Sequence, residues 1–394
     1  MSGATFLVGD VFERLAEIPD GSVDLVLTSP PFLALRSYLP DDHPDKAKEI
    51  GSEPTPAEFI DTLLRLTAEW ERVLAPHGSI AVELGDTYAG SGGGGGDYLP
   101  GGMREGQQQF AGSASTMRES NAAHWRQKNK QRDAWPLDKS MCGIPHLYHL
   151  SLAYGRNLLT GEESPAGMWR VRNVVAWCRP NPPVGALGDK YRPATSYITI
   201  ATRARDRWFD LDAVRNQASG PVRMQRVGEA SASRGVSGGD SGNPDKERAS
   251  HNPAGSPPLD WWEVPTEPYK GSHYATWPRR LLTRPIESMC PREVCTACGE
   301  PRRRLVDVEG LQGKRPPMPE ITRTTTGWSD CGCGAPFRTG IVLDPFAGSG
   351  TTLAVATGLG RDAIGIDLDA RNAELARDRC GMFLTVIAPG EVAA

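Results

Sequence analysis

The stretch that decides the fold is Ile341-Val342-Leu343-Asp344-Pro345-Phe346-Ala347-Gly348-Ser349-Gly350-Thr351-Thr352. Its three leading apolar residues predict a buried strand, and a turn rich in Gly and Ser leads into Thr351–Gly358, which has helical character. A second apolar run, Ala363–Ile366, ends on the acid Asp367. A strand, glycine turn, helix, strand and acid in this order are typical of an open α/β sheet that holds a nucleoside cofactor. We therefore predict an α/β fold with a doubly wound, mostly parallel sheet, similar to the Rossmann fold.

The spacing of the glycines restricts the cofactor class. Gly348 and Gly350 give G-x-G, without the third glycine of a dinucleotide fingerprint and without the Gly-Lys-Ser/Thr of a P-loop. A nucleoside cofactor without a pyrophosphate fits this turn better than NAD or ATP. A plain strand–helix crossover with no ligand is the alternative.

Composition excludes several other classes of protein. The chain has 394 residues, of which 39% are hydrophobic and 23% charged, as in a soluble globular protein of roughly two domains or one large domain with insertions. The net charge of −4 requires any DNA-binding surface to be local. Residues 1–9 carry no secretory signal, and no apolar run approaches roughly 18 residues, so we expect a cytoplasmic protein without a membrane span.

A second motif lies near the amino end of the chain. Val23–Leu27 predicts a buried strand, and Thr28-Ser29-Pro30-Pro31-Phe32 follows it. Two adjacent prolines stop a strand and hold the backbone extended. The motif would therefore present a serine, a carbonyl and an aromatic ring at the carboxyl edge of the sheet, where α/β proteins bind ligands. A strand stopped by prolines, with no function, is the alternative.

Two close pairs of cysteines indicate a metal site. Cys295-x-x-Cys298 and Cys331-x-Cys333 are the spacing at which four thiolates surround a tetrahedral zinc ion, which with four thiolate ligands would be structural. Cys290 is a spare candidate ligand. Disulfides are not expected in an apparently cytosolic chain, and four reduced surface cysteines are the alternative.

The two motifs together resemble those of a known enzyme family. Residues 28–32 and 344–352, in this order, resemble the amino-methylating DNA methyltransferases of the permuted beta group. Residues 260–265 and 273–278 are similar to the segment that these enzymes carry before the cofactor loop, and the cysteine pairs resemble a zinc knuckle of some members. The resemblance covers almost the whole chain outside residues 90–138 and 217–258. The first of these segments is rich in Gly, Ser, Gln and Asn, and the second in Ser, Gly, Arg and Pro.

The resemblance implies S-adenosylmethionine as the cofactor. The residues that it places around the cofactor are Asp10, Asp344, Phe346, Gly348, Ser349, Gly350, Thr351 and Asp367, with Ala275, Thr276 and Pro278 closing over the methionine end. Asp367 would accept from the ribose hydroxyls. We expect Ser29 and Asp344 to line one cleft.

The resemblance also implies the chemistry of Ser29, Pro30, Pro31 and Phe32. The amino nitrogen of a base is a poor nucleophile because its lone pair is delocalised into the ring. Hydrogen bonds from that amino group to Ser29 Oγ and the Pro30 carbonyl would orient the lone pair toward the methyl group. Phe32 would stack on a target base that has left the duplex.

The resemblance divides the chain into seven segments. They are a catalytic half (1–89), a flexible insertion (90–138), the rest of the catalytic half (139–210), a target-recognition segment (211–258), a cofactor-closing segment (259–289), a zinc knuckle (290–338) and a cofactor-binding half (339–394). Arg215, Arg223, Arg226 and Arg234 are candidate contacts to DNA in the recognition region.

Serine at the first position of the tetrapeptide favours N4 of cytosine in double-stranded DNA as the methyl acceptor. The alternatives are methylation of adenine N6 on the same fold, methylation of RNA or of a protein amide, and a non-catalytic zinc-knuckle protein that binds DNA. A restriction endonuclease acting on the same site is a possible partner of such an enzyme.

Overall fold

The structure, a computed structural model, describes ten stretches of the chain. These are residues 2–35, 38–39, 42–89, 134–182, 189–216, 224–226, 247–249, 255–267, 277–309 and 322–391. Most of the predicted insertion at 90–138 and most of residues 217–258 lie outside them. So do Arg223 and Arg234.

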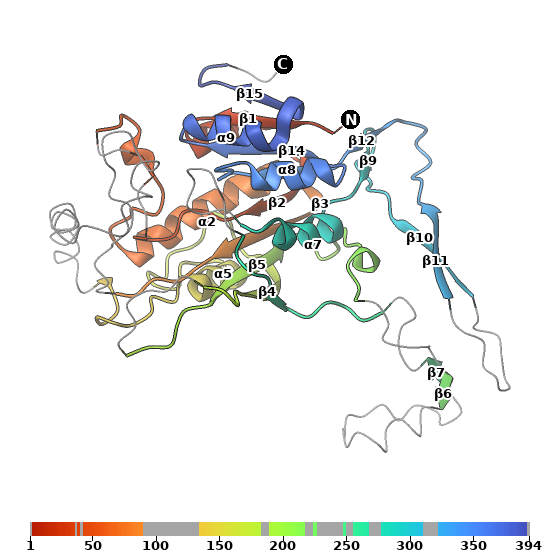
Figure 1. The fold of residues 1–394 in the computed structure, drawn as a ribbon, viewed down its shortest axis with the longest axis horizontal. Helices are drawn as coiled ribbons and strands as arrows, with labels where there is room; N and C mark the ends of the chain where they lie inside the picture. Colours follow the sequence, from red (N-terminus) through yellow and green to blue (C-terminus); the bar gives the residue numbers. More distant parts are fainter. Residues whose placement is uncertain are drawn as a thin grey trace.

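Within these stretches, a nine-stranded sheet forms the centre of the molecule (Figure 1). Its strand order is β15 (Leu384–Ile387), β1 (Ala4–Val8), β14 (Asp362–Asp367), β13 (Ile341–Asp344), β2 (Val23–Thr28), β3 (Leu74–Leu84), β5 (Thr195–Thr202), β4 (Arg170–Cys178) and β8 (Trp261–Glu263). The strands from β15 to β3 run parallel, β5 is antiparallel to both its neighbours, and β8 is parallel to β4. The predicted doubly wound, mostly parallel sheet is confirmed.

Helices cover both faces of this sheet (Figure 1). The buried apolar residues of α1 (Val11–Ala16), α2 (Pro56–Val73) and α5 (Ile144–Tyr154) form one core. Those of α7 (Arg279–Met289), α8 (Thr351–Gly358) and α9 (Arg371–Cys380) form a second core on the opposite face. The short helical turns are η1 (Lys46–Lys48), η4 (Leu211–Ala213) and η5 (Gly381–Phe383). None of the described helices is long and apolar enough to cross a membrane.

Among the described residues, three two-stranded sheets lie outside the central sheet. They are β6 (Met224–Arg226) with β7 (Glu247–Ala249), β9 (Glu293–Cys295) with β12 (Phe337–Thr339), and β10 (Arg304–Glu309) with β11 (Thr322–Trp328). The β10–β11 hairpin extends away from the body of the molecule, on the side opposite the carboxyl ends of the parallel strands (Figure 1). The β9–β12 sheet joins the base of that hairpin to the start of β13.

The sequence explains where α2 begins but not where it ends. Thr55 Oγ1 accepts from the Glu58 backbone N–H at 3.2 Å, as in a capping box. Pro76 and Gly78 are strong helix stops, yet the helix already ends at Val73 and β3 runs on through both of them. Leu74 pairs with β2 before the register of that ladder shifts, so strand pairing ends the helix earlier than the local sequence requires.

Candidate functional site

The two motifs meet at the carboxyl edge of the sheet. β13 pairs in parallel with β2, with Val342 opposite Leu25 and Leu343 opposite Val26. The glycine turn after β13 and the tetrapeptide after β2 therefore leave the same edge of the sheet side by side. β14 and β1 are parallel neighbours in the same sheet, so Asp367 and Asp10 reach this edge as well.

A cavity of about 710 Å³ opens at this edge. Its volume lies within the range of roughly 300–1,000 Å³ that is usual for sites of small molecules and cofactors. The predicted site residues that line it are Asp10, Ser29, Pro30, Pro31, Phe32, Phe346, Gly348, Ser349, Thr351 and Asp367. Of the described residues in the prediction, Asp344, Gly350 and Pro278 are not part of its lining. Ala275 and Thr276 lie outside the described residues.

Asp367 holds the turn and faces the cavity. Its carboxylate accepts from the backbone N–H of Gly348 at 2.8 Å, from that of Asp369 at 2.8 Å and from Asn372 Nδ2 at 3.0 Å. Burial raises the pKa of the Asp367 carboxyl to about 6, although these hydrogen bonds act to lower it. Asp10 lies at the next strand end, where its side chain caps α1. Two carboxyl groups at adjacent strand ends are suited to accept from hydroxyl groups of a ligand.

Asp344 lies underneath the cavity rather than in its wall, contrary to the expectation that it would line a cleft with Ser29. The side chain is 1% exposed. It accepts from Thr28 Oγ1 at 2.7 Å, from Thr352 Oγ1 at 2.5 Å and from the Phe346 backbone N–H at 3.1 Å. Burial raises its pKa to about 6. Asp344 thus ties the end of β2 to the glycine turn and the start of α8, because buried hydroxyls on both sides need an acceptor.

Gly350 also has a packing role. It has a φ of +73°, and a Cβ atom there would lie 2.8 Å from the Cβ of Ala376 in α9. Glycine at this position therefore lets α8 begin close against α9. The sequence predicted that a glycine is needed, but not that the neighbour is a helix rather than the ligand.

The tetrapeptide forms another wall of the cavity. Ser29 Oγ donates to Glu83 Oε2 at 2.6 Å, and Glu83 is 3% exposed at the carboxyl end of β3. The Phe32 ring packs on Gly85, where an added Cβ would lie only 2.6 Å from the ring. The serine and the ring are therefore held by the strand next to their own.

Sequence reasoning missed the residues that β3, β4 and β5 contribute. Glu83, Asp86, Tyr88, Trp177, Arg179, Lys190 and Thr195 line the same cavity. Asp86 accepts from the Gly143 and Ile144 backbone N–H groups at 2.9 and 3.1 Å, so it caps α5 from a distance in sequence. The signal available beforehand was position alone, since charged residues at the end of a predicted strand lie at the ligand-binding edge.

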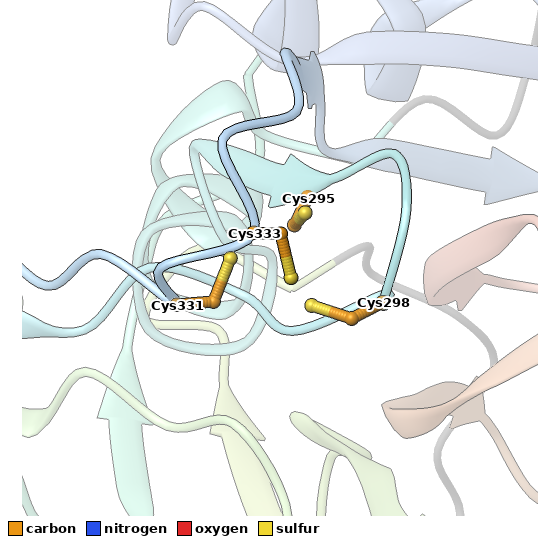
Figure 2. Close-up of side chains that lie close together, drawn as sticks. All are labelled: Cys295, Cys298, Cys331 and Cys333. Atoms are coloured by element: carbon orange, nitrogen blue, oxygen red, sulfur yellow. The ribbon is translucent and has the colours of Figure 1, made fainter.

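The four predicted cysteines come together. The sulfur atoms of Cys295, Cys298, Cys331 and Cys333 all lie within 4.8 Å of one another. Figure 2 shows the side chains converging from the end of β9 and the loop after it, and from the loop that precedes β12. Backbone N–H groups of Cys298 and Ala297 point to the Cys295 sulfur and lower the pKa of that thiol to about 7. Sulfur ligands at about 2.3 Å from a tetrahedral zinc ion would be roughly 3.8 Å apart, so the cluster fits that geometry.

Cys290 is separate from this cluster. It is fully buried below β13 and its thiol donates to the Pro291 carbonyl. Burial raises the pKa of the Cys290 thiol well above its usual range, which is typical of a packed core cysteine.

Arg215, expected to face DNA, is engaged within the fold. Its Nε lies 2.6 Å from Asp212 Oδ1 and its Nη1 donates to the Gly255 carbonyl at 3.1 Å. The side chain is 11% exposed. Arg215 thus anchors η4 to residue 255.

Comparisons with known proteins show which proteins the chain is similar to. A family model described as DNA methylase matches residues 23–378. The type II methyltransferase M.SmaI of Serratia marcescens is 23% identical over 376 residues, which cover 95% of this chain and 89% of the relative. The type II methyltransferase M.Cfr9I of Citrobacter freundii is 23% identical over 380 residues, covering 96% and 88%. Among solved structures, PvuII DNA methyltransferase (cytosine-N4-specific) is 13% identical with a TM-score of 0.48, covering 95% of this chain and 86% of its own.

Proposed function

The chain belongs to the DNA methylase family of amino-methyltransferases, and from this premise we propose that it transfers a methyl group to N4 of a flipped cytosine in duplex DNA. S-adenosylmethionine is the methyl donor of this family. The observation that carries the proposal is one cavity with two kinds of wall. Gly348 and Asp367 line one part of it, and Ser29, Pro30 and Phe32 line another.

The cofactor wall fits a nucleoside with a charged tail. Asp367 would accept from the ribose hydroxyls, with Asp10 at the next strand end. The glycine turn of residues 346–351 would lie against the methionine portion. S-adenosylmethionine, when bound, supplies a methyl group activated by a positively charged sulfur. Asp344 would act indirectly, because its hydrogen bonds to Thr28 and Thr352 hold the turn and the tetrapeptide together.

The acceptor wall fits an exocyclic amino group. Ser29 gives its hydroxyl hydrogen to Glu83, so the lone pairs of Oγ remain available to accept from the amino group. The Pro30 carbonyl would be the second acceptor, and Pro31 holds that carbonyl in the extended path after the strand. Two acceptors on the same nitrogen would turn its lone pair away from the ring and toward the methyl group. Positioning and charge placement would then provide the catalysis without a covalent enzyme intermediate.

A base in a duplex cannot reach a cavity of this kind. We therefore infer that the target base rotates out of the helix, which costs a few kcal/mol that contacts in the pocket must offset. Stacking on Phe32, worth about 1–3 kcal/mol for a base on an aromatic ring, would supply part of that energy. Gly85 behind the ring leaves Phe32 in place for this contact.

The choice of cytosine over adenine rests on Ser29 as the first residue of the tetrapeptide. The test is to methylate DNA with the purified protein, digest it to nucleosides and identify the product by mass spectrometry. N4-methylcytosine is the expected product. N6-methyladenine alone would mean that the same fold acts on adenine. If neither methylated base were found, the proposed methyltransferase activity would be refuted.

We further propose that Cys295, Cys298, Cys331 and Cys333 hold one structural zinc ion. The support is that the four sulfur atoms lie within 4.8 Å of one another. Binding energies of zinc in small peptides are about 10–16 kcal/mol, enough to hold such loops together. Metal analysis should find one zinc per chain. Cys298→Ser should lose it and Cys178→Ser, outside the cluster, should keep it; zinc-free wild-type protein would be decisive against the site.

The division of the chain into catalytic, recognition and cofactor-binding segments remains part of this proposal, as does a restriction endonuclease that acts on the same site. The type II methyltransferases among its relatives favour such a pairing. Sequencing of host DNA for modified motifs would identify the recognition site. Cleavage of the unmodified motif by extracts of the same host would then reveal the partner, and extracts without such cleavage would argue for an enzyme that acts alone.

A further inference from the structure

Arg179 is a cation in the wall of the cavity that neither the sequence motifs nor the methyl transfer chemistry requires. It directly follows β4, and its side chain lines the same cavity as Ser29 and Phe32. The order β2, β3, β5, β4 places it across two strands from Ser29, on the far side of the acceptor wall.

The guanidinium is held in place by its neighbours. It lies over the Trp177 ring, with 4.9 Å between its central carbon and the ring centroid, and its Nη1 donates to Ser196 Oγ at 3.3 Å. The Trp177 ring is itself fixed, because its Nε1 donates to the Val264 carbonyl at 2.8 Å. Stacking and one hydrogen bond thus orient the planar donor group before any ligand arrives.

Part of this donor group lacks an acceptor. Arg179 Nε is buried and has no hydrogen-bond partner among the described residues. Leaving such a donor unsatisfied is unfavourable, and a ligand that brings acceptors relieves it. Burial lowers the pKa of Arg179 while the nearby Glu83 carboxyl raises it. A guanidinium stays charged under these conditions.

Resting on the proposed function, we propose that Arg179 recognises the target cytosine by donating hydrogen bonds to its N3 and O2 atoms. On the edge of cytosine, N4 is followed by N3 and then by O2, and both of these atoms are acceptors. Ser29 and the Pro30 carbonyl would take N4 at one end, and the guanidinium would take N3 and O2 at the other. Glu83 accepts from Ser29 and lies close enough to Arg179 to raise the pKa of the guanidinium, so it links the two ends.

This arrangement discriminates between the two possible bases. Adenine presents N6, then the acceptor N1, then a C–H group where cytosine has O2. A two-pronged donor would therefore keep one hydrogen bond to adenine and meet a carbon at the second position. Arg179 would contribute selectivity as well as affinity, because the loss of a hydrogen bond to a charged group is larger than that of a neutral one.

The test removes the donor and the acceptor separately and together. The substrate is an unmethylated duplex that carries the sequence motif which the enzyme methylates. Its target base is either cytosine or a cytosine analogue that lacks O2. Wild-type enzyme should lose about 10- to 100-fold in kcat/KM on the analogue. Arg179→Ala should lose a similar factor on cytosine and should show little further loss on the analogue, because the two partners act as a pair.

Matched measurements separate this proposal from the others. Arg172→Ala removes an exposed arginine at the opposite end of the same strand and should behave as wild type. Arg179→Ala should keep wild-type affinity for S-adenosylmethionine, measured by calorimetry, which confirms that it is folded. The role of Arg179 would be overturned if the losses from Arg179→Ala and from the analogue multiplied independently when combined, or if Arg179→Ala kept full activity. Neither result would affect N4 methylation itself. N6-methyladenine as the wild-type product would overturn the target base and this inference together.

Discussion

At the scale of single residues, the site depends on which polar atoms are left available to a ligand. Ser29 donates its hydroxyl hydrogen to Glu83, and the Asp367 carboxylate accepts from a backbone N–H of the turn. Each remains an acceptor toward the cavity. Asp344 also accepts three hydrogen bonds and has a similarly raised pKa, but it is 1% exposed and does not line the cavity. Two aspartates that end neighbouring strands therefore differ in role because Asp367 faces the cavity and Asp344 does not.

Ser29→Ala should lower kcat by about 10²–10³-fold, by analogy with the loss of one oriented hydrogen-bonding group at a reacting centre. Affinity for S-adenosylmethionine should be unchanged, because Ser29 belongs to the acceptor wall. Ser22→Ala is the control, since Ser22 precedes the same strand at its other end and its hydroxyl donates to the Pro19 carbonyl at 2.7 Å. Single-turnover methylation together with calorimetric binding would check this. A variant with wild-type kcat would refute the assigned role.

Binding of S-adenosylmethionine should weaken at acid pH because of Asp367. Its pKa of about 6 in the free protein means that the carboxyl is mostly protonated below pH 6. If the ribose hydroxyls donate to the ionised form, the proton must leave first, so affinity should fall toward tenfold per pH unit below about 6 and be flat above it. Asp367→Asn should bind weakly at every pH without this dependence. Asp362→Asn, at the opposite end of β14, should keep the wild-type profile; calorimetry from pH 5 to 8 decides.

At the scale of elements, close backbone packing shapes the cofactor wall. Gly365 in β14 leaves room for the glycine turn that follows β13 and for the first residues of α8. A Cβ at this position would lie 2.8 Å from Ala347 Cβ and 2.8 Å from a Leu353 methyl. The glycine turn and α8 therefore sit directly on β14, and the position of the turn is set from below by a strand as well as by its own glycines.

Gly365→Ala should lift the glycine turn and weaken S-adenosylmethionine binding. Overpacking of this kind typically lowers the free energy of unfolding by about 1–3 kcal/mol. Gly358→Ala is the matched control, because a Cβ there meets nothing within 4 Å. Because Gly358 lies in a helix, its replacement by Ala should raise the free energy of unfolding by about 0.5–1 kcal/mol. Urea unfolding and calorimetric binding of both variants provide the check; equal behaviour of the two would contradict the packing argument.

At the scale of the whole molecule, the cysteine cluster is tied to the sheet through one buried acid. Asp24 at the start of β2 is fully buried and accepts from His77 Nε2 at 2.8 Å. It also accepts from Arg338 Nη1 and Nη2 at 2.6 and 3.1 Å, and from the Ile341 backbone N–H at 2.7 Å. Arg338 belongs to β12, which follows the cysteines, and Ile341 is the first residue of β13. The knuckle region and the cofactor strand thus share an anchor.

Arg338→Ala should destabilise the protein by about 3 kcal/mol, the low end for breaking a buried ion pair, because two other partners of Asp24 remain. Arg303→Ala is the control, since its 3.6 Å pair with Glu300 is more than half exposed and should contribute under about 1 kcal/mol. Urea unfolding measures both. A loss at Arg338 no larger than the loss at Arg303 would mean that Asp24 does not depend on the knuckle.

The sequence alone determined the local pieces of this protein and their class. The strand–glycine turn–helix unit, the proline-stopped strand before Phe32 and the boundaries of α8 follow from short-range backbone preferences, which a few adjacent residues encode. These preferences placed Ser29 and Asp367 at the carboxyl edge, and the predicted parallel sheet is confirmed. The cysteine spacing likewise predicted a cluster that the loops do form.

Only the tertiary structure decided the partners of buried polar groups. Thr28 and Asp344, 316 positions apart, meet because β2 and β13 are neighbours. The pair of Ser29 with Glu83 and the entry of Arg179 into the cavity follow equally from strand order. A buried hydroxyl or carboxyl must find a partner, but its own sequence does not say which strand will supply it. For this reason the motif residues could be named from the sequence, whereas the residues that orient them and line the rest of the cavity could not.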